Sequence, residues 1–98
     1  MDEPLFLNNW IFKYSSSEED ENGDAAIYAL GDVYNHMSHV DGTRFKTGPI
    51  IKIFDNKIIT ESGNTFYLMT PSKEYLKFIA TIKGKNKVVD ETMKALKN

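Results

Sequence analysis

The stretch from residue 50 to residue 69 constrains the fold more than any other part of the sequence. It contains three short runs rich in Ile, Phe, Tyr and Thr, separated by the dipeptide Asp55-Asn56 and by a Ser-Gly-Asn segment at 62–64. Asp and Asn both tolerate the positive φ angles that a two-residue hairpin turn requires. The sequence therefore predicts a three-stranded antiparallel meander with strands at 50–54, 57–60 and 65–69.

The spacing of the apolar residues changes directly after this meander. Thr70-Pro71 resembles a helix start, with Thr70 as the N-cap and proline in the first turn. Apolar residues then recur at helical spacing, which predicts a helix over 71–83 whose apolar stripe covers the sheet. The stripe consists of Tyr75, Phe78, Ile79 and Ile82. A weaker pattern after Asn86 predicts a second helix.

Two further strands are predicted before the meander. Residues 5–14 alternate aromatic and other side chains, and residues 25–34 alternate apolar residues around Gly31, which suggests a bulge or a close approach of another group. Between them, residues 15–24 contain no apolar side chain, so we expect a mobile loop there. Residues 1–4 are also expected to be mobile. Residues 43–54 are read as one extended segment interrupted by Gly48-Pro49.

These elements predict an α+β fold in a single domain over residues 1–98. A small antiparallel sheet must cover its apolar face, and the C-terminal helices are the available cover. We therefore expect a curled five-stranded antiparallel sheet or small barrel with one or two C-terminal helices. A chain of this size supports one hydrophobic core.

Composition narrows the classes of function. The chain has no cysteine, which excludes disulfides and zinc–thiolate sites. Its acidic start lacks the basic and apolar segments of a signal peptide, and no apolar run approaches the length that spans a bilayer. We expect a cytoplasmic protein without membrane contact. Arg44 is the single arginine, and base readout favours arginine, so sequence-specific DNA binding is not expected.

The charge is unevenly distributed. The net charge is −2, but residues 1–24 carry seven acids and one lysine, whereas residues 73–98 carry seven lysines and three acids. Such asymmetry can mark an interaction tail or a mimic of nucleic-acid charge. The favoured interpretation is a solubilising acidic loop and a solvated helix face.

The search for catalytic and metal-binding motifs favours a protein that is not an enzyme and needs no cofactor. There is no Gly-rich phosphate loop, His-Glu-x-x-His or Gly-x-Ser-x-Gly motif. His36, His39 and Asp41 could ligate a metal, but a spacing of three residues converges on one face only in a helix. We expect these residues in a surface loop without metal. An enzyme with His36 as general base and Asp41 as its orienting group ranks last, because no nucleophile accompanies them.

A nucleotide pocket is the alternative that the aromatic residues leave open. Tyr34 is followed closely by Arg44 and Lys46, and aromatic faces stack on bases while cations contact phosphates. Tyrosines in a strand are also common as plain sheet surface or core. The sequence favours that second interpretation without excluding the first.

Residues 31–68 contain a pattern that resembles a group of small uncharacterised bacterial and phage proteins. The matching segments are Gly31-Asp32-Val33-Tyr34-Asn35-His36, Asp41-Gly42-Thr43, Thr47-Gly48-Pro49-Ile50 and Thr60-Glu61-Ser62-Gly63-Asn64-Thr65-Phe66-Tyr67-Leu68. The sequence departs from the group at Phe45, where the group has an aliphatic residue, and at Gly48-Pro49.

The resemblance implies an accessory protein of phages or mobile elements in a bacterial cytoplasm. Small acidic phage proteins often inhibit host defence, either by binding a host protein directly or by sequestering a cyclic nucleotide or related signalling molecule. The resemblance thus implies one of these two modes, and a homo-oligomer is a further expectation. The ligand residues expected from the resemblance and from the aromatic cluster together are Tyr34, Asn35, His36, Asp41, Thr43, Arg44, Lys46 and Thr47.

Overall fold

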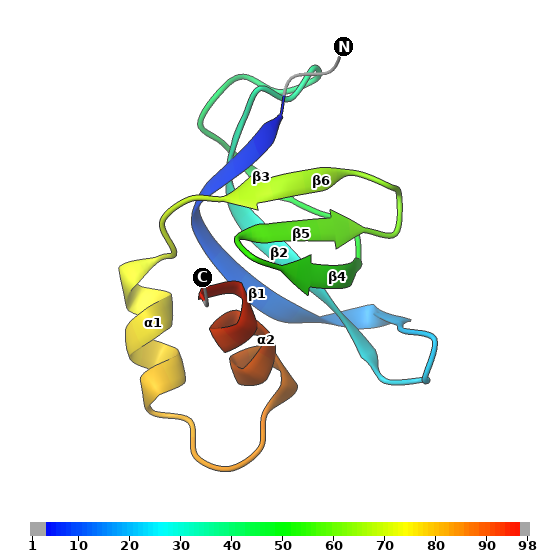
Figure 1. Cartoon of the computed structure of the whole chain (residues 1–98), viewed down its shortest axis with the longest axis vertical. Helices are drawn as coiled ribbons and strands as arrows, with labels where there is room; N and C mark the ends of the chain where they lie inside the picture. Colours follow the sequence, from blue (N-terminus) through cyan, green and yellow to red (C-terminus); the bar gives the residue numbers. More distant parts are fainter. Residues whose placement is uncertain (1–3, 97–98) are drawn as a thin grey trace.

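The computed structural model describes residues 4–96, which form a six-stranded sheet and two helices (Figure 1). The sheet order is β3-β2-β1-β6-β5-β4, with β3 and β4 at its two edges. The predicted α+β class is confirmed. The strands are β1 (Leu5–Glu19), β2 (Ala25–Tyr34), β3 (Thr43–Lys46), β4 (Ile50–Phe54), β5 (Lys57–Thr60) and β6 (Thr65–Leu68), and the helices are α1 (Lys73–Ala80) and α2 (Lys87–Leu96).

The predicted meander is confirmed, but the count of five strands is not. Residues 43–54, expected as one extended segment, form two strands that lie at opposite edges of the sheet. Thr47 ends the first of them, because its backbone N–H donates to the carbonyl of Ala29 and its hydroxyl accepts the N–H of the same residue. Pro49 then follows without an N–H of its own. The chain stops pairing with β2 at this point and starts the meander at the other edge of the sheet, which curls so that β4 still contacts β2.

The sheet is mixed rather than wholly antiparallel, and it is an open sheet rather than a barrel. Residues Leu5–Leu7 of β1 pair in parallel with Phe66–Leu68 of β6, whereas the other strand pairs are antiparallel. This parallel pair joins the N-terminal hairpin to the meander. No local sequence pattern indicates it, because the two strands are separated by most of the chain.

The loop predicted over residues 15–24 is shorter in the structure. Residues 15–19 extend β1, and the chain turns only over 20–24. The backbone N–H of Asp20 donates to the carbonyl of Asp24, and the Asp20 carboxylate accepts the N–H groups of Asn22 and Asp24. Residues 1–3, where mobility was also expected, lie outside the described part.

Both helices pack on the inner face of the sheet. Buried side chains from the strands, among them Leu7, Phe12 and Phe66, form one core with Tyr75 and Ile79 of α1 and with residues of α2. The predicted apolar stripe of α1 is therefore only partly correct, since Phe78 remains 61% exposed. The helix is also shorter than the predicted 71–83. Ser72 rather than Thr70 is its N-cap, and it ends at Ala80, so Ile82 lies beyond it.

Candidate functional site

The first group of predicted site residues lies around the connection between β2 and β3. Asn35 has a left-handed backbone with φ of 67°, and its N–H donates to the Asp41 carboxylate at 2.8 Å. Its side-chain amide donates to the carbonyl of Pro4 at 3.1 Å. The polar groups of Asn35 and Asp41 thus hold the loop together and tie it to the start of β1.

The two histidines form a small aromatic cluster rather than a metal centre. The rings of His36 and His39 lie 4.6 Å apart, and each lies 5.0 Å from the ring of Phe45. Nδ1 of His36 accepts the backbone N–H of Ser38. Among residues 4–96 no group of three or more His, Asp or Glu side chains is arranged to hold a metal ion.

Arg44 and Lys46, two further predicted residues, lie on the outer face of β3. Arg44 pairs with Asp32 at 3.3 Å and donates to the carbonyl of Asn9 at 2.8 Å. The ammonium of Lys46 lies 4.5 Å above the ring of Tyr28. Arg44 and Lys46 alternate with Phe45, so they point away from the core.

Tyr34, Thr43 and Thr47 complete the predicted set. Tyr34 is partly exposed on the same outer face as Arg44, whereas Thr47 is buried and Thr43 is the register partner of the buried Val33. The structure therefore distributes the predicted residues along β2 and β3 over both faces of the sheet. Their role in binding a ligand stays a prediction.

A groove that the sequence did not indicate lies between β1 and α1. Beyond Leu7, β6 no longer pairs with β1, and among the described residues that edge of β1 has only an isolated bridge from Trp10 to Pro71. Farther along this edge, the Phe12 backbone hydrogen-bonds the hydroxyl of Tyr75 in α1. The resulting cleft of about 580 Å³ is lined by Ile11, Phe12, Lys13, Tyr14, Arg44, Ser72, Glu74, Tyr75, Phe78, Ile82, Asn86 and Val88.

The groove is apolar and open to solvent. Phe78 is 61% exposed and Tyr14 is 43% exposed, while Ile11 and Ile82 are partly buried against the core. Phe78 belongs to a stripe that reads as core in the sequence. It remains exposed because α1 lies at the edge of β1, so that only Tyr75 and Ile79 face inward.

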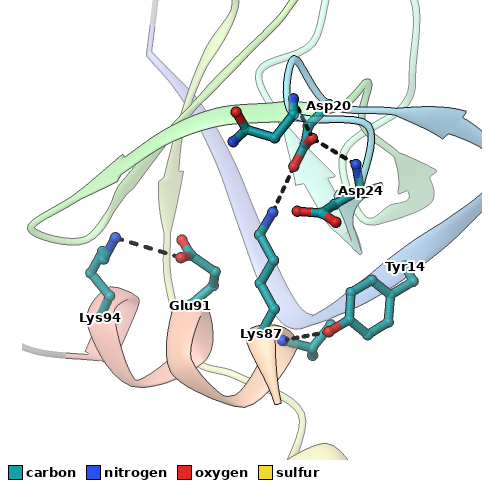
Figure 2. Close-up of polar contacts among 8 residues, drawn as sticks. Tyr14, Asp20, Asp24, Lys87, Glu91 and Lys94 are labelled. Atoms are coloured by element: carbon teal, nitrogen blue, oxygen red, sulfur yellow. Dashed lines mark hydrogen bonds and ion pairs between the residues drawn. The ribbon is translucent and has the colours of Figure 1, made fainter. Parts of the chain in front are cut away.

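Buried hydrogen bonds fix the walls of this groove. The Tyr75 hydroxyl and the Thr92 hydroxyl lie 2.6 Å apart and join α1 to α2. Burial raises the pKa of Tyr75 above its ordinary value of 10.0, although its hydrogen bonds oppose that change. The Tyr14 hydroxyl accepts the backbone N–H of Val88 at 3.3 Å (Figure 2). The two helices and β1 are thereby held as one unit.

A second cleft, of about 780 Å³, lies between the 20–24 turn, β4 and α2. Two ion pairs lie along its wall. Lys87 donates to the Asp20 carboxylate at 2.7 Å, and Lys94 lies 3.5 Å from Glu91 (Figure 2). The hydrogen bond with Lys87 lowers the pKa of Asp20 below 3.8, and the same bond raises the pKa of Lys87.

Neither helix within residues 4–96 has the length and apolar character needed to cross a bilayer.

In a comparison with known proteins, no protein-family model matches the chain and no curated protein is similar to it in sequence.

Proposed function

We propose that this protein is a non-enzymatic binding module that holds a segment of another protein in the groove between β1 and α1. The observation that supports this proposal is the exposed ring of Phe78 at the wall of an apolar cleft. Apolar patches on small proteins are typical of interaction sites when polar groups surround them. Here Lys13, Glu74 and Asn86 supply such a polar rim.

The geometry suits a bound peptide segment. The side chains of β1 and the adjacent apolar face of α1 offer contacts to the side chains of a bound segment. Both walls are rigidly held, by the bridge of Trp10 to Pro71 and by the pair of Tyr75 with Thr92. A preformed groove loses little entropy on binding.

The biological role of such binding follows from the resemblance alone. On that basis the partner is a host defence protein, and occupation of the groove inhibits it. A second copy of the chain is the other occupant that the groove would accept.

Substitution of one exposed side chain tests the proposal. Phe78→Glu places a charge on the apolar wall and should weaken capture of a bacterial partner at least about tenfold. Val40→Glu is the matched control, because Val40 is an apolar residue with 81% exposure in the loop between β2 and β3. Captured proteins are identified by mass spectrometry, and binding is then measured with the purified partner by calorimetry.

The proposal requires that Phe78→Glu loses a partner which the wild type and Val40→Glu retain. Equal retention by all three proteins, or loss with Val40→Glu only, would contradict it. A second copy of the chain could also occupy the groove, and Phe78→Glu would abolish that self-association too. Light scattering on the purified protein detects it by measuring the molecular mass.

Sequestration of a cyclic nucleotide or related molecule is the second candidate. It is supported by the placement of Tyr34, Arg44 and Lys46 on one outer face of the β2–β3 hairpin. A ligand that binds only the folded state at 100 times its Kd stabilises that state by about 2.7 kcal/mol. A rise in melting temperature with a cyclic nucleotide, lost in Arg44→Gln, is the expected result. Unchanged melting with a panel of cyclic nucleotides would count against it.

A further inference from the structure

An aromatic and cationic row crosses five strands on the outer face of the sheet. Strand register places Phe54 opposite Lys57, Lys57 opposite Tyr67, Tyr67 beside Phe6, and Phe6 opposite Tyr34. The row therefore runs across β4, β5, β6, β1 and β2 without interruption. At a strand spacing of about 4.8 Å it is roughly 19 Å long.

The side chains of this row contact one another. The Lys57 ammonium lies 5.1 Å from the Phe54 ring centroid and 5.3 Å from that of Tyr67. The rings of Tyr67 and Phe6 lie 5.7 Å apart. Lys52, two residues before Phe54, places its ammonium 5.1 Å from the same ring. Lys52 and Lys57 thus flank the Phe54 ring, Lys57 also contacts Tyr67, and the Phe6 ring follows Tyr67.

The row lies on the face that the helices leave uncovered. The residues next to it in each strand are buried in the core, namely Ile53, Ile58, Phe66, Leu7 and Val33. Successive side chains of a strand point to opposite faces, so the row points away from that core and from the helices packed on it. All five members of the row are partly exposed.

The outer face is also cationic, in contrast to the net charge of −2 for the whole chain. Asp32 lies on this face, and Arg44 forms an ion pair with it. Asp55 lies beyond the end of the row, in the turn between β4 and β5. The basic residues on the outer face are Lys13, Arg44, Lys46, Lys52 and Lys57.

We propose that this face binds single-stranded nucleic acid independently of base sequence, with bases stacked on Tyr67, Phe6 and Phe54 and phosphates held by Lys52 and Lys57. Sheet surfaces with two or three aromatic rings stack two or three bases. Every base has a stacking face, and lysine contacts carry no sequence information, so this surface is sequence-tolerant. The row shares no residue with the groove between β1 and α1. Nucleic-acid binding by the row and peptide binding in the groove can therefore be tested independently.

Fluorescence anisotropy with labelled oligothymidine and oligouridine of about twelve nucleotides tests the proposal. The wild type should bind both, and affinity should fall about sevenfold between about 50 mM and about 200 mM salt if two phosphates are held. Tyr67→Leu, which keeps apolar bulk but removes the ring, should weaken binding at least about fivefold, whereas Tyr67→Phe should not. A preference for oligouridine over oligodeoxyuridine of the same length would identify RNA as the ligand, since these two differ only in the 2′-hydroxyl.

A charge-matched pair separates the row from general electrostatic attraction. Lys57→Ala should weaken binding and flatten its salt dependence, whereas Lys77→Ala, which removes an exposed lysine of α1, should change binding little. Melting curves confirm that each variant is folded. Absence of binding by the wild type at low salt, equal effects of the two lysine substitutions, or full affinity in Tyr67→Leu would each overturn the proposal.

Discussion

Gly31 shows how a single residue can be read correctly from the sequence. Its position inside a strand predicts a bulge or a close approach, and the structure confirms the close approach. A Cβ atom at Gly31 would lie 3.0 Å from the carbonyl oxygen of Asn8 and 3.3 Å from side-chain atoms of Leu7. A side chain at this position would therefore be crowded by the packing of β1 against β2.

Gly31→Ala should destabilise the fold by about 1–3 kcal/mol, because the added methyl group meets backbone that cannot move freely. Gly48→Ala is the control, since the nearest atom to its added Cβ, the Ser62 hydroxyl oxygen, lies 4.0 Å away. Urea denaturation followed by fluorescence of Trp10 measures both. Equal stability of the two variants would show that β1 and β2 are not packed as closely as described.

At the scale of elements, the hairpins were predictable and their assembly was not. The meander is encoded locally, since Asp55-Asn56 and the 62–64 segment are turn signals between β-rich runs. The pairing of β1 with β6 and the separation of β3 from β4 depend on residues far apart in the chain. The groove between β1 and α1 arises from that assembly, and so Phe78 reads as core in the sequence but is exposed in the fold.

The start of α1 illustrates the same limit. Thr70 is a good N-cap by residue type, but its carbonyl accepts the N–H of Trp10 and its own N–H donates to the Asn8 side chain. The chain is still bound to β1 at that point. Ser72 therefore takes the capping position, and its hydroxyl accepts the N–H of Tyr75 at 3.3 Å.

Ser72→Ala should lower the free energy of unfolding by about 0.5–2 kcal/mol, the usual cost of removing an N-cap side chain. Thr70→Ala should cost much less, because the backbone groups of Thr70 make its contacts with β1. Thermal denaturation followed by far-ultraviolet circular dichroism compares the two. A larger loss of unfolding free energy in Thr70→Ala than in Ser72→Ala would instead identify Thr70 as the N-cap.

At the scale of the whole molecule, the fold brings the two ends of the charge asymmetry together. The acidic N-terminal third and the basic C-terminal segment read as separate solvated regions in the sequence. In the structure Asp20 and Lys87 form a hydrogen-bonded ion pair, so part of the asymmetry is neutralised internally. The pattern of charge was visible in the sequence, but the contact between its two ends was not.

The Asp20–Lys87 pair makes a prediction about pH. Because the folded-state pKa of Asp20 lies below 3.8, its contribution to stability is present above that pH and is lost as the pH falls through the lowered pKa. A carboxyl titration by nuclear magnetic resonance should find this low pKa in the wild type and a higher one in Lys87→Ala. An unchanged pKa in Lys87→Ala would show that the turn and α2 do not meet.

The central claim is that another protein is recognised through the groove beside Phe78. Photo-crosslinking tests it most directly, with a photoreactive phenylalanine analogue placed at Phe78 in one protein and at Met37 in another. Met37 is 98% exposed in the loop that carries the residues first predicted to bind a ligand. We expect one discrete crosslinked product from position 78 and none from position 37. Capture from position 37 without capture from position 78 would contradict the account.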